Sequence, residues 1–244
     1  MLRPPRTAAR PGGDRMPSTA PTAGRTPPPR LFAPPGVYRP QADTRLLAEA
    51  LAREDLGPAA SVMDIGTGTG ALALDAAGRG ARVTAVDVSW PAVLAAHVNA
   101  LRQRLPVRVL HGDFAARTRG QRFDLVLANP PYVPSPSARL PSHGAERAWD
   151  AGPAGRLVID RICARARAML RPGGVLLMVH SALCGPRTTL RCLERAGLSA
   201  RVVMHAAVPW GPVLRARRAW LEGQGLAGAD DEWEELVIIR AQRI

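Results

Sequence analysis

Apolar positions along the chain follow two different periods. Short apolar runs predict β-strands over residues 62–65, 82–86, 107–110, 123–128 and 175–180. Longer alanine- and leucine-rich stretches, with apolar residues three and four apart, predict helices over residues 44–53, 71–77, 91–101, 156–170 and 188–196. Strands that alternate with helices in this way are typical of a parallel sheet covered by helices on both faces.

Two further strands are predicted near the C-terminus, over residues 200–208 and 235–240. The long segment between them contains arginine, glycine and tryptophan, and a connection of this length indicates a functional loop or an antiparallel hairpin that ends the sheet. We therefore expect an α/β protein with a doubly wound, mostly parallel sheet of seven strands whose last strand pair is antiparallel.

The N-terminal part of the chain has a different composition. Residues 1–40 contain eleven prolines and few apolar side chains, which predicts a disordered tail over residues 1–36 and one folded domain over residues 37–244. The prolines exclude the amphipathic helix of a transit peptide, and no apolar run reaches 18 residues. We expect no membrane span and a cytoplasmic location.

Charge and cysteine content limit the partners. The three cysteines are not in CxxC spacing and have no histidine cluster beside them, so neither a disulfide framework nor a metal site is expected. The net charge is +13, and all 33 basic residues are arginine, without any lysine. Two interpretations remain open: codon bias of a GC-rich genome, or a surface that contacts RNA or the ribosome. The oligomeric state is also left open.

The strongest local motif is a strand that runs through a glycine-rich turn into a helix. Here Asp64 precedes Gly66, Thr67, Gly68 and Gly70. Glycines allow positive φ and a close approach of the backbone to a ligand, while the helix N-terminus supplies free N–H groups. The alternating glycines differ from the G-x-G-x-x-G pattern of dinucleotide sites. The motif therefore predicts a ligand site without naming the ligand.

Acidic residues also follow the next two strands. Asp87, with Val88 after it, ends the second strand, where a carboxylate can accept hydrogen bonds from both hydroxyls of a ribose. Asp113 follows the third strand and can accept from an exocyclic adenine amine, with Phe114 packing near the ring. The carboxyl ends of parallel strands lie on one edge of the sheet, so we expect these acids to form one site.

The fourth strand ends in Asn129, Pro130, Pro131 and Tyr132. The two prolines lack N–H donors and fix φ, so the carbonyl groups around them leave the regular ladder. The Asn129 Oδ1 atom and the Pro130 carbonyl can then accept the two hydrogens of a planar NH₂ group while Tyr132 stacks on its face. These four residues are the predicted catalytic set.

At this point the chain resembles the class I methyltransferases that use S-adenosylmethionine, and among them the HemK-like protein glutamine methyltransferases with an Asn-Pro-Pro-Tyr motif. Residues 37–44, Val-Tyr-Arg-Pro-Gln-Ala-Asp-Thr, resemble the Val-Tyr-x-Pro-x-x-Asp-Thr segment of the short branch without an N-terminal helical domain. The resemblance implies a Rossmann-like fold and S-adenosylmethionine as cofactor. It places Thr44 against the amino-acid end of the cofactor and adds Asn129 to the cofactor site.

The resulting hypothesis is transfer of a methyl group from S-adenosylmethionine to a planar nitrogen. The leading acceptor is a protein glutamine side chain, as in a translation release factor. The alternative acceptor is a nucleic-acid base amine, adenine N6 or guanine N2, because a flipped base would stack on Tyr132 in the same way. A third hypothesis is a non-catalytic scaffold that binds the cofactor. No general base is evident, so catalysis is expected from orientation.

Overall fold

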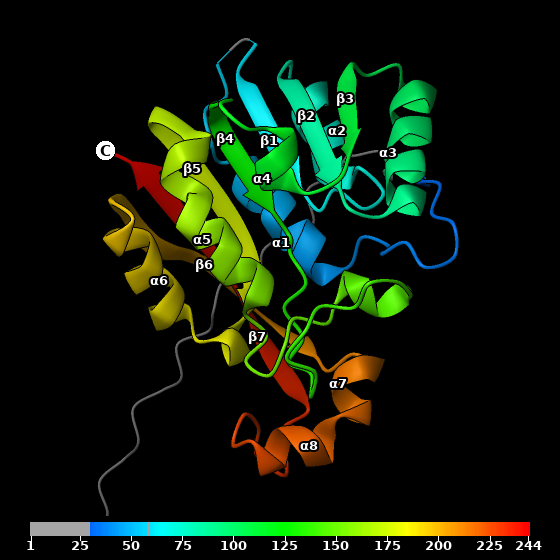
Figure 1. The fold of residues 1–244 in the computed structure, drawn as a ribbon, viewed down its shortest axis with the longest axis vertical. Helices are drawn as coiled ribbons and strands as arrows, with labels where there is room; N and C mark the ends of the chain where they lie inside the picture. The colour runs from blue at the N-terminus through cyan, green and yellow to red at the C-terminus, as the bar shows by residue number, and fades with distance from the viewer. Residues whose placement is uncertain (1–29, 58) are drawn as a thin grey trace, which may run out of the picture. The chain divides into compact units, whose positions relative to one another are not determined.

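A seven-stranded sheet in the order β3-β2-β1-β4-β5-β7-β6 forms the centre of the protein (Figure 1). The computed structural model describes residues 30–57 and 59–244. The strands are β1 (Ser61–Ile65), β2 (Arg82–Asp87), β3 (Val107–His111), β4 (Phe123–Ala128), β5 (Leu170–Ser181), β6 (Leu198–Pro209) and β7 (Trp233–Arg243). The first five strands pair in parallel, and β7 lies antiparallel between β5 and β6. The predicted fold class is confirmed.

The predicted long helices are present with small shifts at their ends. They are α1 (Ala42–Leu51), α2 (Ala71–Gly78), α3 (Trp90–Gln103), α5 (Leu157–Met169) and α6 (Pro186–Arg195). Three short helices and two 3₁₀ turns were not predicted, namely α4 (Phe114–Arg117), α7 (Pro212–Ala216), α8 (Arg218–Gly223), η1 (Ala145–Ala148) and η2 (Ala182–Cys184). Elements of three to six residues are too short to show a helical period.

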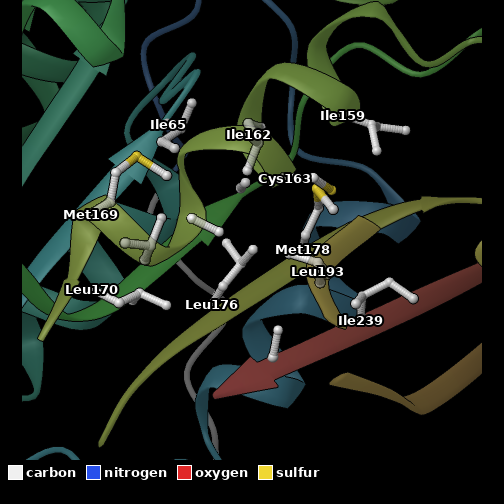
Figure 2. Close-up of a cluster of buried hydrophobic side chains, with 14 of the residues drawn as sticks. Ile65, Ile159, Ile162, Cys163, Met169, Leu170, Leu176, Met178, Leu193 and Ile239 are labelled. Atoms are coloured by element: carbon white, nitrogen blue, oxygen red, sulfur yellow. The ribbon is translucent and has the colours of Figure 1, made fainter. Parts of the chain in front are cut away.

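Helices cover both faces of the sheet. Successive side chains of a strand point to opposite faces, so both faces carry apolar side chains that helices bury. On β4, Val126 and Ala128 pack against α5 and α6 in one core cluster, which Figure 2 shows from close by. Leu125 and Leu127 point the other way and pack against α1 and α2. A strand covered on both faces is apolar along its buried part, and this explains the apolar run of residues 125–128 after the half-buried Asp124.

The compact unit that contains the sheet extends from Leu31 to Ile244. Of the tail expected over residues 1–36, residues 1–29 lie outside the described residues. Phe32 lies within them and packs near Val37 and α3. Its backbone N–H donates to Asn99 Oδ1 at 2.8 Å, and its carbonyl accepts from Asn99 Nδ2 at 2.9 Å. Asn99 Nδ2 also donates to the Thr69 carbonyl at 3.0 Å, so this side chain joins residue 32 to the glycine turn.

Among the residues that the structure describes, no helix combines the length and the apolar character that a membrane crossing requires.

Candidate active site

The glycine turn after β1 is fixed by contacts with the end of β2. The backbone N–H of Gly66 donates to the Val86 carbonyl at 2.8 Å. Gly66, Gly68 and Gly70 all have positive φ, between 55° and 84°. A Cβ at Gly70 would lie 3.2 Å from Ala96 of α3, so glycine is needed here for close packing as well as for the turn. The predicted turn therefore stands at the carboxyl edge of the sheet.

Asp87 lies beside this turn, as the sequence predicted. One carboxylate oxygen accepts from the Gly68 N–H at 3.0 Å, and the other accepts from the Ser89 N–H at 2.8 Å. Burial raises the pKa of Asp87, and these two N–H groups partly oppose the shift. Each oxygen of a carboxylate has two lone pairs, so each can accept a second hydrogen bond. The geometry fits a ligand that offers two neighbouring hydroxyls. Val88, the next residue, is 47% exposed.

Asp64 lies beneath the turn. Its side chain is 1% exposed, and it accepts a hydrogen bond of 2.6 Å from the Thr67 hydroxyl. Burial raises its pKa to about 7, while the Thr67 hydroxyl lowers it. In the structure Asp64 therefore holds the conformation of the turn, and a direct contact with a ligand stays a prediction.

Asp113 and Phe114 stand at the end of β3, which is joined to β2 by the Gly112 N–H donating to the Asp87 carbonyl. One oxygen of Asp113 caps α4 through the N–H groups of Ala115 and Ala116, and the other pairs with Arg161 at 2.5 Å. The Phe114 ring is buried in the core cluster of Figure 2. The predicted contacts of these two residues with adenine also stay predictions.

The Asn-Pro-Pro-Tyr motif follows β4 directly, and it lies next to the glycine turn. A Cβ on Gly66 would be 3.9 Å from the Asn129 carbonyl oxygen. The Asn129 amide nitrogen donates to the Thr44 hydroxyl at 3.3 Å, although 85 residues separate the two in sequence. The structure thus brings together Thr44, the glycine turn and the predicted catalytic set.

Asp43 connects residues 37–44 with the motif. Its carboxylate is 3% exposed. One oxygen accepts from the hydroxyls of Tyr38 at 2.8 Å and Tyr132 at 3.2 Å. The other accepts from the Thr44 N–H at 2.6 Å and the Thr44 hydroxyl at 3.2 Å. Asp43 lies within residues 37–44, but no role was predicted for it.

Glu234, at the start of β7, was missed altogether. Its Oε2 atom is buried and has no hydrogen-bond partner among the described residues. Burial raises the pKa of Glu234, and the Ser181 hydroxyl opposes the shift. The charge of Glu234 also contributes to the raised pKa of Tyr132, so the two side chains lie in the same region. The predicted strand began at residue 235, so Glu234 fell outside every predicted element.

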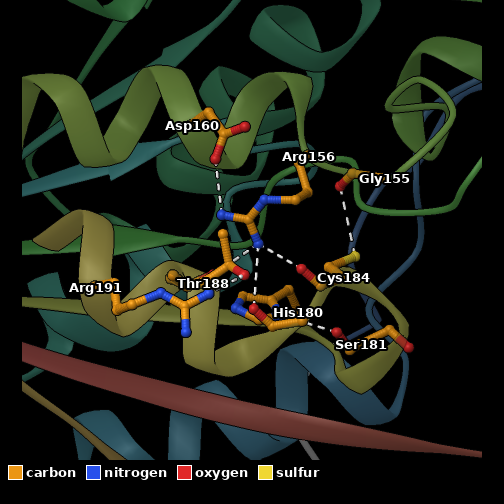
Figure 3. A network of polar contacts seen from close by, with 10 residues as sticks. Gly155, Arg156, Asp160, His180, Ser181, Cys184, Thr188 and Arg191 are labelled. Carbon is orange, nitrogen blue, oxygen red and sulfur yellow. Dashed lines mark hydrogen bonds and ion pairs between the residues drawn. The ribbon is translucent and has the colours of Figure 1, made fainter.

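The backbone carbonyl of Tyr132 is fixed by a hydrogen bond from η2. The Cys184 thiol donates to the Tyr132 carbonyl at 3.1 Å, and burial raises its pKa to about 12, so it keeps the proton that it donates. Arg156 binds the carbonyls of Cys184 and Gly185 and pairs with Asp160 at 2.7 Å (Figure 3). These contacts fix the position of the motif relative to α5 and η2.

The helices between β6 and β7 pack against the loop that follows the motif. Arg217 donates to the Pro134 carbonyl at 3.0 Å and pairs with Asp150 at 2.6 Å. Arg218 stacks over the buried Trp210 ring, 4.6 Å from its centroid. Arg217 and Arg218 are thus engaged in contacts within the protein. This segment connects the antiparallel strands β6 and β7, so the hairpin expectation is confirmed, and a functional role of the segment stays a prediction.

The site has a defined chemical character. It offers backbone N–H groups and a carboxylate on the side of β1 and β2, and acceptor oxygens with an aromatic ring on the side of β4. No group of three or more potential metal ligands occurs in residues 30–57 and 59–244. Such a site can bind a cofactor with a sugar and orient a planar NH₂ group beside it.

Comparison with known proteins shows which class of protein the chain resembles. Residues 30–140 match the family model described as the methyltransferase small domain. A glycine turn, an acid after β2 and an Asn-Pro-Pro-Tyr motif on a seven-stranded Rossmann-like sheet are the features of a methyltransferase that uses S-adenosylmethionine.

Relatives that are 30–40% identical in sequence show the family of the chain. A putative protein N5-glutamine methyltransferase of Methanocaldococcus jannaschii is 30% identical over 189 residues, which cover 76% of this chain and 92% of that relative. A release factor glutamine methyltransferase of Moorella thermoacetica is 40% identical over 155 residues, 59% of this chain. The chain belongs to the family of protein glutamine methyltransferases. It spans 54% of the length of the Moorella enzyme.

Solved structures show the same fold at lower sequence identity. The methyltransferase complex of E. cuniculi Mtq2 with Trm112, which methylates the termination factor eRF1, aligns with a TM-score of 0.61 and 22% identity, over 86% of this chain and 99% of that chain. The T. thermophilus 16S rRNA N2 G1207 methyltransferase, solved with its cofactor and guanosine, aligns with a TM-score of 0.56 and 24% identity, over 88% of this chain and 45% of that chain. Protein and RNA methyltransferases thus share this sheet.

Proposed function

We propose that this protein transfers a methyl group from S-adenosylmethionine to the side-chain amide nitrogen of a glutamine, and that its substrate is a translation release factor. The observation that carries the proposal is the position of Asn129: its amide nitrogen is engaged by Thr44, and it lies beside the glycine turn. The names of the relatives support the acceptor, since several are release factor glutamine methyltransferases.

The described residues fit the proposed cofactor. Asp87 has free lone pairs at the place where ribose hydroxyls would lie, and the neighbouring glycines let a ligand approach the backbone. When bound, S-adenosylmethionine supplies an electrophilic methyl group on its sulfonium. Thr44, whose hydroxyl accepts from the Asn129 amide, would border its amino-acid end, as the resemblance implies.

The acceptor side provides orientation. Asn129 Oδ1 and the Pro130 carbonyl would accept the two hydrogens of the glutamine NH₂ group, and Tyr132 would pack on the amide plane. The nitrogen lone pair is then aimed at the methyl carbon. As the nitrogen–carbon bond forms, the carbon–sulfur bond breaks and its electron pair returns to sulfur. The two acceptor oxygens stabilise positive charge that develops on nitrogen, and water takes the released proton.

The test is transfer of tritiated methyl groups by the purified protein into extract from its source cells, followed by separate protease and nuclease digestion. We expect protease-sensitive label in a release factor, with mass spectrometry placing the added methyl group on a glutamine. An Asn129→Ala protein serves as the negative control. Label that only nuclease removes would overturn the proposal in favour of a base amine, and no label in any macromolecule would favour a scaffold.

A further inference from the structure

We infer that Asp43 is a positioning residue for the methyl acceptor. Through the Thr44 hydroxyl it fixes which end of the Asn129 amide faces the substrate. It also accepts a hydrogen bond from the Tyr132 phenol and so holds that ring in place. The inference rests on the proposed function for its catalytic consequence. Asp43 lies on a segment that is distant in sequence from the Asn-Pro-Pro-Tyr motif. It determines whether this motif can select an NH₂ group.

Asp43 is surrounded by hydrogen-bond donors. An ionised carboxylate only accepts hydrogen bonds. Asp43 accepts four of them, from the Thr44 N–H and hydroxyl on one oxygen and from Tyr38 and Tyr132 on the other. Its side chain is almost completely buried, so water does not compete for these donors. The directions of the three hydroxyl hydrogens are therefore set by one negative charge.

Thr44 links Asp43 to the Asn129 amide. A hydroxyl has a single hydrogen, and that of Thr44 points to Asp43. The Thr44 oxygen can then only accept a hydrogen bond from its other neighbour. That neighbour is the Asn129 amide, 3.3 Å away, so the atom that faces Thr44 has to be Nδ2. The choice between nitrogen and oxygen at this amide follows from the hydrogen-bond network.

The orientation of the Asn129 amide determines which group it offers to a substrate. With Nδ2 turned to Thr44, the other end of the amide group is Oδ1, an acceptor suited to a substrate NH₂ group. If Thr44 donated to Asn129 instead, the amide would turn and place NH₂ against NH₂, which repels. The same carboxylate anchors the Tyr132 hydroxyl. One charge thereby aligns both ends of the Asn-Pro-Pro-Tyr motif.

The composition of the chain makes this orientation measurable. The sequence contains two asparagines, Asn99 and Asn129. Protein labelled with ¹⁵N-asparagine therefore gives two side-chain NH₂ signals by NMR. The Asn99 signal is an internal reference, because that side chain is 1% exposed and bonds to Phe32 and Thr69, away from Asp43.

The experiment compares Asp43→Ala with Glu49→Ala, which removes an exposed carboxylate from the same helix. In Asp43→Ala we expect the Asn129 NH₂ signal to shift and its hydrogens to exchange at least about fivefold faster, the factor for losing roughly one hydrogen bond. The Asn99 signal and all signals of Glu49→Ala should stay unchanged. Thr44→Val should reproduce the change at Asn129, and Thr44→Ser should restore the wild-type signal.

Kinetics supply the second readout. Asp43→Ala should lower kcat/KM for methyl transfer by about tenfold or more, a modest misalignment effect, with little change in cofactor affinity. The NMR test needs neither acceptor nor cofactor, so it separates the two claims. An unchanged Asn129 signal in both Asp43→Ala and Thr44→Val overturns the inference. A shifted signal with full kcat/KM overturns the positioning role, while a wild-type protein without glutamine transfer overturns the proposed function alone.

Discussion

The predicted cofactor half of the site, residues 64–70 and 87–88, and the acceptor half, residues 129–132 with their neighbours, differ in the origin of their contacts. In the cofactor half, Thr67 bonds to Asp64 three residues away, and Asp87 binds backbone N–H groups two and 19 residues away. In the acceptor half, the partners of Asn129 and Tyr132 are 85 and 89 residues away. The first half is built from turns at neighbouring strand ends, and the second is assembled by the whole fold.

This difference has a physical consequence. Backbone N–H groups at a strand end keep their direction when a distant side chain changes, because the parallel ladder holds them. The acceptor half relies on side chains of α1, η2 and the β6–β7 connection, so we expect a change in any of these elements to alter the geometry around residues 129–132. We therefore expect substitutions to affect the two halves differently, in stability as well as in function.

The largest expected effect compares two glycines with nearly the same φ, 66° at Gly155 and 68° at Gly66. A Cβ at Gly155 would overlap the Tyr132 carbonyl oxygen and lie 2.9 Å from the Cys184 sulfur, whereas at Gly66 the nearest atom is 3.9 Å away. Gly66→Ala should cost about 1–2 kcal/mol of unfolding free energy from backbone strain. Gly155→Ala should cost about 2–5 kcal/mol, because overpacking adds to that strain.

Urea denaturation of both variants measures this difference. Gly223→Ala, at a glycine with open space around it and no positive φ, is the control and should change stability least. Equal losses at Gly66 and Gly155 would mean that the backbone behind Tyr132 is not tightly held.

The next effect is catalytic. Asn129→Ala should lower kcat/KM for methyl transfer by at least about 10²-fold, the scale of one oriented transition-state contact. Cofactor affinity should change far less, because the ribose contact is assigned to Asp87. Methyl transfer and calorimetric cofactor binding are measured on the same protein, with Gln224→Ala as a control that removes an exposed amide. Parallel loss of binding and activity would move Asn129 into the cofactor half.

The converse substitution tests the cofactor half. Asp87→Ala should weaken binding of S-adenosylmethionine by about 1.5–3 kcal/mol, the range for hydrogen bonds to a charged group. Asp75→Ala, which removes a carboxylate from a surface ion pair with Arg79, should leave the affinity unchanged. Calorimetry decides the matter, and wild-type affinity in Asp87→Ala would exclude this residue from the site.

The same contrast explains how far the sequence could predict the protein. Strand ends such as Asp87 and the turn at Gly66 were found because their signals are local, and the mostly parallel sheet class was predicted from the alternating strands and helices. β5 begins at Leu170, five residues before its predicted start, since Pro172, Gly173 and Gly174 interrupt the apolar run. Asp43 and Glu234 acquire their meaning only from partners that the fold brings to them, and no local pattern marks such partners.

The smallest effect at ordinary pH concerns the only two tyrosines of the chain, Tyr38 and Tyr132, which both donate to Asp43. Burial raises the pKa of each phenol, and the Asp43 charge raises it further. The folded protein should therefore show no phenolate absorbance near pH 10, where the unfolded chain titrates. Because the folded pKa values are raised, the stability that both phenols contribute is fully present below about pH 10 and is lost as the pH rises through the folded values. Asp43→Ala should bring both titrations closer to pH 10, whereas Glu49→Ala should not. Phenolate absorbance of the folded wild-type protein at pH 10 would show that the Asp43 network, and with it the long-range assembly of the acceptor half, is absent.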